Sequence, residues 1–234
     1  MVRQVRRPIE RLTDMLLLLF LINDVNDKDH NCGITKLQKL VFLSQLEMNN
    51  HRQKGFSYKF VKINLGPVSG QIEKTDIPKL EKVGYLAQEQ VGNFNKFVAS
   101  ESGSRFLSHL SGIFHRNERF VQIISRINEK YSGMSATDLV NEVHSMPNPY
   151  RRNLTIDETP QGEVLLSKIS DKATQTRFDF TGNELATLEL YFDAEARESV
   201  ERAMSSALSE PSVPWEVVLR HAEEALRGKG QQRL

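Results

Sequence analysis

Four basic side chains that could bind phosphate stand close together in the first third of the chain. Arg52, Lys54, Lys59 and Lys62 lie within eleven residues, and no acidic residue separates them. Contacts from lysine and arginine to phosphate supply most of the nonspecific affinity of proteins for nucleic acid. An exposed edge strand is an equally good interpretation, because edge strands favour lysine as a protection against aggregation. The cluster therefore predicts either a DNA-backbone contact or a protected sheet edge.

Further candidates for DNA contact lie in the helices and the hairpin expected after this cluster. On the helices, the residues that could face a DNA groove are Gln71, Lys74, Lys79 and Lys82. At the hairpin tip, beside Phe94, the candidates are Asn93, Asn95 and Lys96. Three acidic side chains in the helical stretch repel phosphate and weaken the DNA interpretation: Glu73, Asp76 and Glu81.

No pattern in the sequence is typical of an active site or a metal site. The single Cys32 excludes an internal disulfide and a cysteine-only zinc site. Gly66-x-x-x-Gly70 forms no phosphate-binding loop. Five histidines lack metal-ligand spacing on one helix face: His51, His109, His115, His144 and His221. We therefore expect neither an enzyme nor a bound cofactor or metal.

Charge divides the chain into two unequal parts. Residues 1–150 carry 20 Lys and Arg against 15 Asp and Glu, whereas residues 151–234 carry 11 against 15. The first part is therefore basic by five charges and the second acidic by four, which is typical of a nucleic-acid-binding part joined to a partner-binding part. The apolar run at 15–22 is too short to span a membrane, and we expect a buried helix in a cytoplasmic protein.

Hydrophobic periodicity predicts helices joined by a few short strands. In the first part we expect helices over 8–22, 35–48, 68–74, 77–83, 113–131 and 135–144, with a further helix capped by Ser100. We expect strands over 56–63, 85–88 and 96–99, the last two joined by a turn at Gly92-Asn93. Pro78 argues against one continuous helix, and Asp76 is expected to cap its second piece.

The segment Pro147-Asn148-Pro149 is the clearest candidate for a domain boundary. It would separate a domain over 1–147 from an acidic, helical module over 151–234. In that module, residues 162–169 fit either a strand or a short helix. The remaining expected helices end near Tyr191, run over 193–208 after an Asp193 cap, and run over 215–226.

The order helix, helix, strand, helix pair, hairpin and helix is that of a winged-helix domain. Its most telling part is Leu80-x-x-x-Gly84-Tyr85-Leu86 followed by Phe97-x-x-x-Glu101-x-Gly103-x-x-Phe106. The chain resembles the Panacea (pan-antitoxin) domain and its YwgA-like relatives over roughly residues 9–147. The resemblance rests on these pieces, in order: Leu37-Gln38-Lys39-Leu40-Val41-Phe42-Leu43, Phe56-x-Tyr58-x-Phe60, Gly66-Pro67-Val68-Ser69, Leu80 to Leu86 as above, and Leu139-Val140-x-x-Val143-His144-x-x-Pro147.

This resemblance implies an antitoxin or a regulator associated with phages and mobile elements, without catalytic residues. The chain departs from the family pattern at Pro78 and in its long C-terminal part. The expected fold class is mainly α with a small β wing: a winged helix-turn-helix core plus a helical C-terminal module.

The C-terminal helices are similar to the toxin-binding ends of small antitoxins, which place an amphipathic helix in a groove of the toxin. An ordinary packing helix is the competing interpretation, because amphipathic helices are common. If the segment binds a partner, its contact residues would be Val200, Met204, Leu208 and Trp215.

Two functions of different classes remain open. The first is a dimeric winged-helix regulator of double-stranded DNA, either a transcriptional repressor or an autoregulating antitoxin. The second is a protein-binding antitoxin or adaptor that uses the winged-helix surface for a polypeptide and never contacts DNA. The basic charge of residues 1–150 favours the first, and its modest size leaves the second open.

Overall fold

A computed structural model describes residues 6–28, 30–92, 94–196, 198–200 and 202. The chain divides into two compact units, residues 1–192 and 193–234, which are considered separately. The helices of the first unit are α1 (Pro8–Asn26), α2 (Ile34–Asn50), the π-helical turn η1 (Ile72–Asp76), α3 (Ile77–Lys82), α4 (Glu101–His109), α5 (Ser111–Arg116), α6 (Glu118–Tyr131), α7 (Ala136–Ser145) and α8 (Gly182–Tyr191). Its strands are β1 (Gln53–Lys54), β2 (Phe60–Ile63), β3 (Gly66–Val68), β4 (Leu86–Val91), β5 (Phe94–Ala99), β6 (Val164–Leu166) and β7 (Thr176–Arg177).

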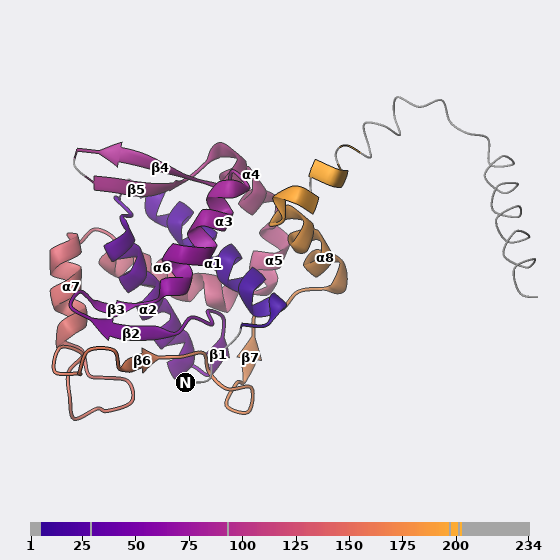
Figure 1. The fold of residues 1–234 in the computed structure, drawn as a ribbon. Helices are drawn as coiled ribbons and strands as arrows, with labels where there is room; N and C mark the ends of the chain where they lie inside the picture. The colour runs from indigo at the N-terminus through magenta and orange to yellow at the C-terminus, as the bar shows by residue number, and fades with distance from the viewer. Residues whose placement is uncertain (1–5, 29, 93, 197, 201, 203–234) are drawn as a thin grey trace, which may run out of the picture. The chain divides into compact units, whose positions relative to one another are not determined.

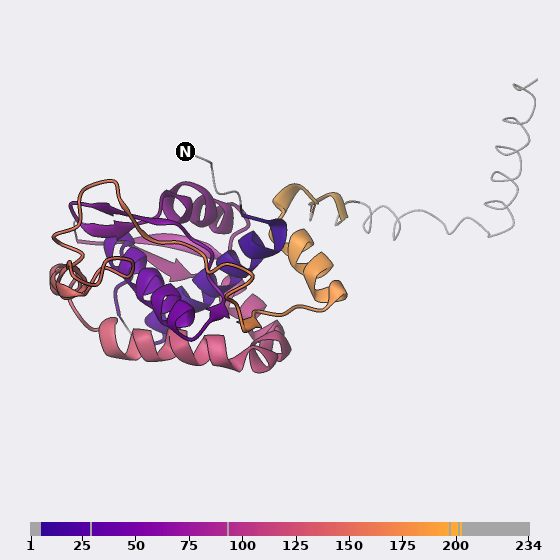
Figure 2. The ribbon, with the colours of Figure 1, turned by 90° about the horizontal axis from the view of Figure 1, so that it is seen from below.

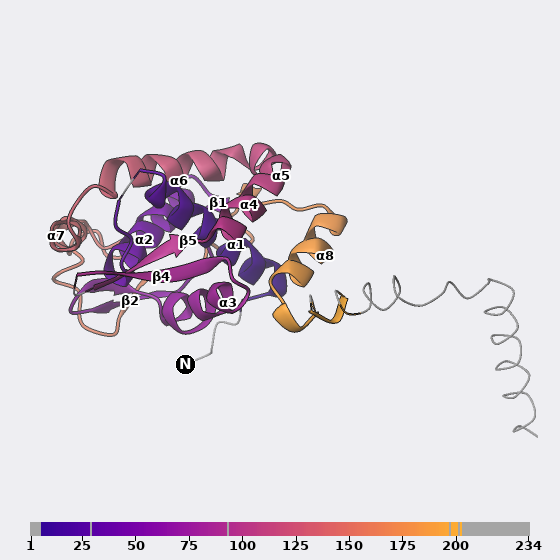
Figure 3. The same cartoon turned by 90° about the horizontal axis from the view of Figure 1, so that it is seen from above.

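The core of the first unit forms around α1 and α2. Seven of the eight residues of the apolar run at 15–22 are buried, so the expectation of a buried helix is confirmed. A helix that is apolar on every side must be covered on every side. Figure 3 shows the cover: α6 lies on one side of α1 and α2, and α3 lies on the other. Figure 2 shows α6 along one face of the unit. Within the described ranges, no helix is long and apolar enough to cross a bilayer.

Small sheets complete the first unit (Figure 1). In the described ranges, β1 pairs with β7 in parallel, β2 lies between β3 and β6 in antiparallel pairs, and β4 pairs with β5 as an antiparallel hairpin. The hairpin register runs from Leu86 opposite Ala99 to Val91 opposite Phe94. The fold is therefore helical with a small β part, as the sequence predicts.

The base of the β4–β5 hairpin is attached to the loop between α1 and α2. The Phe97 N–H donates to the Cys32 carbonyl at 2.9 Å. The Asn26 side chain donates to the Phe97 carbonyl at 3.2 Å and accepts from the Ala99 N–H at 3.0 Å. The hairpin therefore has a fixed position against α2.

The division between the units lies after Phe192, and the boundary expected at 147–149 falls inside the first unit. Strands β6 and β7 pair with β2 and β1, and the ring of Phe178 packs on Phe120 with centroids 5.4 Å apart. Asn148 is buried, and its side chain donates to Thr159 at 2.8 Å. The proline-rich segment is therefore a packed turn. A purely helical module over 151–234 is a wrong expectation for the part described.

Several local predictions are confirmed by hydrogen bonds. The Ser100 hydroxyl caps α4, as expected. The hydroxyls of Ser135 and Thr181 cap α7 and α8 in the same way. In the second unit, Asp193 Oδ1 accepts from the N–H groups of Glu195 and Ala196, as expected for a cap. Helix 113–131 differs, because it is broken at Asn117 into α5 and α6.

A buried glutamine of α2, Gln45, forms the hydrogen bonds that a neighbouring strand would otherwise form with the backbone before β2. The Gln45 side chain donates to the Tyr58 carbonyl at 2.8 Å and accepts from the Tyr58 N–H at 3.0 Å. These bonds satisfy backbone groups that a strand ladder would otherwise satisfy. The expected strand over 56–63 is therefore paired only over Phe60–Ile63, although Phe56 and Tyr58 are buried as predicted.

Candidate functional site

The helical segment that would face a partner runs without a break from Gly70 to Lys82. Its first part contains the π-helical turn η1, and α3 follows directly. Proline has no N–H and clashes with the carbonyl four residues earlier, so a widened turn before Pro78 lets the helix continue. The expected break at Pro78 is therefore wrong.

Asp76 is buried in an ionic network and does not cap α3. Its carboxylate accepts from the Tyr58 hydroxyl at 2.8 Å and from Arg6 at 2.6 and 2.9 Å. The same guanidinium donates to Asp14 at 2.8 Å. Burial raises the pKa of Asp14 to about 8, and Arg6 opposes that shift. The network joins α1 to the helix at 70–82 and fixes the orientation of that helix.

The start of the same helix is bonded to α2. The Gln38 side chain donates to the Ser69 carbonyl at 3.0 Å and accepts from the Ser69 N–H at 2.9 Å. Lys39, also fully buried, donates to the Pro67 carbonyl at 3.0 Å. The helix at 70–82 is therefore held at its beginning and in its middle, which leaves its outer face rigidly presented.

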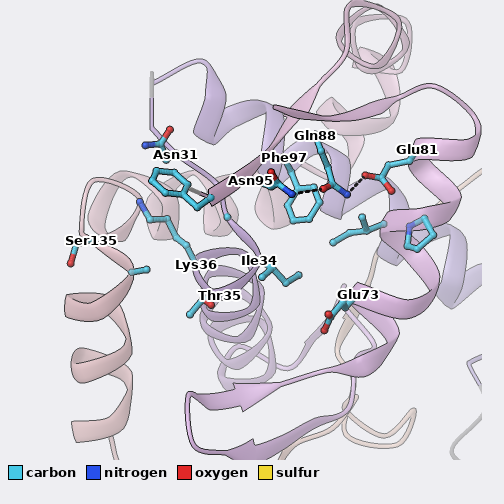
Figure 4. A pocket seen from close by; sticks show the side chains of 15 residues that line it. Asn31, Ile34, Thr35, Lys36, Glu73, Glu81, Gln88, Asn95, Phe97 and Ser135 are labelled. Atoms are coloured by element: carbon cyan, nitrogen blue, oxygen red, sulfur yellow. Dashed lines mark hydrogen bonds between the residues drawn. The ribbon is translucent and has the colours of Figure 1, made fainter. Parts of the chain in front are cut away.

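That outer face forms one wall of a groove of about 760 Å³, which we name the hairpin groove (Figure 4). The other walls are the first turn of α2, strand β5 and the first turn of α7. Its apolar lining residues are Ile34, Ile77, Pro78, Phe94, Phe97 and Ala136. Its polar lining residues include Asn31, Thr35, Lys36, Glu73, Glu81, Gln88, Asn95 and Ser135.

A hydrogen-bond relay holds one carboxylate of the groove in place (Figure 4). Asn95 of β5 donates to Gln88 Oε1 at 3.3 Å, and Gln88 Nε2 donates to Glu81 Oε1 at 2.7 Å. The relay crosses from the hairpin to α3. The amide that donates to Glu81 is neutral, and Glu81 forms no ion pair with any residue that the structure describes.

Charge in the groove is predominantly negative. Glu73 has no side-chain partner in the part of the chain that the structure describes. Lys36 is the basic residue of the lining, and its amine donates to the Ser132 carbonyl at 2.8 Å. Burial lowers the pKa of Lys36. Figure 4 shows Glu73 and Glu81 on one side of the groove, with Lys36 directed to the other.

Two of the lysines expected to contact DNA are buried and ion-paired. Lys54 is 6% exposed and lies 2.8 Å from Glu10 and 2.6 Å from Asp171. The Lys62 side chain is 3% exposed, 3.5 Å from Asp157. Neither amine can reach a phosphate while these contacts hold. We therefore withdraw both lysines as DNA contacts.

The other expected DNA contacts are spread over the surface. Arg52, Lys74, Lys82 and Asn95 are exposed, whereas Gln71, Lys59, Lys79 and Lys96 are partly buried. Lys96 pairs with Glu89 at 2.9 Å, and Gln71 accepts from the Lys59 N–H at 3.4 Å. Only Asn95 of this set lines the hairpin groove. Asn93 lies outside the described residues.

The expected partner contacts of the second unit are mostly beyond the described residues. Val200 is 41% exposed, which fits a surface position. Met204, Leu208 and Trp215 lie outside the described residues.

The titratable side chains outside the groove bear on two kinds of chemistry, a metal site and a reactive thiol. In the described ranges, no group of three or more His, Cys, Asp or Glu could hold a metal ion. Burial raises the pKa of Cys32 to about 12, which leaves almost no thiolate at neutral pH. Burial also lowers the pKa of Lys39 to about 8, with a contribution from Lys62.

The groove was not predicted from the sequence, although several of its residues carried other expectations: Pro78 as a helix break, Asn95 as a DNA contact and Phe97 as part of the hairpin pattern. Glu73 and Glu81 counted there only as evidence against DNA contact. The sequence predicts separate helices over 68–74 and 77–83, so it did not indicate that Glu73 and Glu81 share one continuous helix. Nothing local in the sequence brings Ile34 and Phe97 together.

Comparisons with protein-family models, curated proteins and solved structures find no significant match to this chain.

Proposed function

We propose that this chain is a winged-helix regulator that acts by binding a polypeptide in the hairpin groove, in the manner of an antitoxin or an adaptor. The order α1, α2, helix 70–82 and the β4–β5 hairpin supports the winged-helix interpretation. The observation that carries the proposal is the apolar groove of about 760 Å³ between that helix and that hairpin.

The groove has the composition of a binding site. Ligand sites are concave, mostly apolar, about 300 to 1,000 Å³ in volume, and contain a few converging polar groups. Phe94 is 51% exposed at its edge, and large aromatic side chains dominate the energy of protein interfaces. An exposed aromatic beside an apolar groove favours a partner that covers both.

Negative charge argues against a nucleic-acid ligand here. A phosphate backbone in the groove would approach Glu73 and Glu81, and the lysine of the lining is bonded to Ser132. Phosphate contacts provide most of the affinity in protein–DNA complexes, and an acidic lining cannot make such contacts. A polypeptide has no such requirement.

Selection from a phage-displayed library of random 12-residue peptides tests the proposal on the full chain. Ile34→Arg places a long charged side chain in the groove at a partly buried position. The selected peptides should bind the wild type and lose binding to Ile34→Arg, while the melting temperature stays within about 2 °C. Phe94→Ala should weaken binding about tenfold. Selected peptides that bind Ile34→Arg equally well, or no selected peptides, would overturn the proposal.

Duplex DNA is the second candidate ligand, and a separate observation favours it. Lys59, Lys74 and Lys79 form no ion pair with any described residue, so their charges are available to phosphate. If they bind duplex, the affinity should fall steeply with salt. Gel shifts at 50 and 200 mM salt test this, and Lys74→Gln with Lys79→Gln should weaken any shift. A salt-sensitive shift that remains in the double variant would remove these lysines from the interface.

A further inference from the structure

The hairpin groove limits the chemistry of the polypeptide that it can bind, and this inference rests on the proposed function. Glu73 and Glu81 stand eight residues apart on one continuous helix. At 1.5 Å per residue in an α-helix, and less over the π-helical turn, their Cα atoms are at most about 12 Å apart along the helix axis. Both side chains line the groove, with Ile34 facing them from α2 (Figure 4).

Each carboxylate is available to an incoming cation. Glu73 has no side-chain partner within the described part of the chain. Glu81 accepts one bond from Gln88, which orients it and leaves its charge uncompensated. Lys36 is directed to the opposite side and donates to Ser132. Two negative charges therefore remain to be neutralised when the groove is closed by a ligand, since burying unpaired charge is costly.

Apolar side chains line the groove beside these charges. Ile77 and Phe97 are buried, whereas Ile34 is partly exposed and Pro78 and Phe94 are exposed, so these last three present apolar surface to a ligand. An apolar side chain of a ligand would gain free energy by covering this surface. The ligand that matches the groove therefore presents positive, apolar and positive groups in sequence.

We propose that the partner of the hairpin groove is an extended polypeptide segment of the pattern basic–x–apolar–x–basic. In an extended chain, residues two apart point to the same side, and four residues span about 13 Å. The two basic side chains then meet Glu73 and Glu81 while the middle side chain enters the apolar groove. Lysine and arginine both satisfy this requirement.

The peptides selected on the full chain test this pattern directly. Peptides whose binding depends on the groove should be enriched in Lys or Arg four residues apart, with an apolar residue midway. In fluorescence anisotropy, Glu73→Gln and Glu81→Gln should each raise the Kd of a synthetic selected peptide about threefold to fivefold. Glu129→Gln, an exposed change on α6, is the matched control and should leave the Kd unchanged.

Exchanging the charges of the groove and the peptide is the decisive experiment for this pattern. Glu81→Lys should weaken binding of the basic peptide, and replacing one basic residue of the peptide with Glu should restore it. Groove-dependent peptides that are neutral or acidic would overturn the pattern and leave the proposed function intact. Peptide binding that Ile34→Arg leaves unchanged would overturn both the pattern and the proposed function. Self-association of the chain that depends on Glu73 and Glu81 would identify a second copy as the occupant and also overturn the pattern.

Discussion

The side chain of Gln38 pairs with the backbone of Ser69 in both directions, at 3.0 Å from Nε2 to the carbonyl and 2.9 Å from the N–H to Oε1. Ser69 directly precedes the helix at 70–82, so this pair sets where that helix begins. One buried amide of α2 thereby positions the wall of the hairpin groove that carries Glu73 and Glu81.

Gln38→Leu should destabilise the chain and loosen the groove. Leucine has nearly the volume of glutamine but cannot hydrogen-bond, so the buried Ser69 N–H loses the Gln38 oxygen and the Ser69 carbonyl keeps only the Ile72 N–H at 3.3 Å. An unsatisfied buried polar group costs about 1 to 3 kcal/mol, measurable by urea unfolding. Gln122→Leu, at an exposed site on α6, should change stability by less than about 0.5 kcal/mol. Equal effects of the two changes would show that the Gln38–Ser69 pair contributes nothing specific.

Asp14 should make stability depend on pH. Because its pKa rises from 3.8 to about 8 on folding, the folded chain binds more protons than the unfolded chain between these values. This stabilising contribution is complete below about pH 4 and is lost as the pH rises toward 8.

Asp14→Asn removes this titration, so the difference between the two proteins isolates it from other groups. From pH 5 to 8 the wild type should lose stability relative to Asp14→Asn, by up to about 1.4 kcal/mol per pH unit. Urea unfolding at each pH measures the difference. A constant difference would show that Asp14 is ionised throughout this range in the folded chain.

Gly103 should tolerate no side chain. A Cβ there would lie 2.3 Å from the Tyr85 carbonyl oxygen, because α4 passes directly over that backbone. Gly103→Ala should therefore cost about 1 to 3 kcal/mol in thermal or urea unfolding. Gly112→Ala is the control: nothing lies within 4 Å of its Cβ position in α5, so alanine should stabilise by up to about 1 kcal/mol. Equal stability of the two variants would contradict this packing.

Truncation should separate the two compact units at Phe192. A chain that ends at 192 retains the first unit and should unfold cooperatively. A chain that ends at 149 lacks β6, β7 and Phe178, so its core should be incomplete, with broad unfolding and strong binding of a hydrophobic dye. Cooperative unfolding of the shorter chain would restore the boundary at 147–149.

Local signals explain what the sequence predicts correctly. The Ser100 cap and the turn at Gly92 depend on neighbours within a few residues. Gly84 and Gly92 adopt φ of +78° and +59°, which glycine accepts without strain. Patterns of this range are visible in a single sequence.

Long-range contacts explain what was missed. Lys54 is paired with Asp171, and Lys62 with Asp157, at separations of 117 and 95 residues. No local pattern distinguishes such lysines from exposed ones. The hairpin groove has the same origin, because its walls come from α2, helix 70–82, β5 and α7. The sequence shows Glu73 and Glu81 near each other, but it does not show that the apolar lining residues of the groove lie together.

Hydrogen exchange of the full chain with and without a selected peptide tests the central claim most directly. Bound peptide should slow exchange in the first turn of α2, in helix 70–82 and in β5, and it should give no such protection in Ile34→Arg. Saturating duplex DNA should leave these amides unchanged. Protection by duplex at these segments, or peptide protection confined to other elements, would contradict the assignment of the hairpin groove as a polypeptide-binding site.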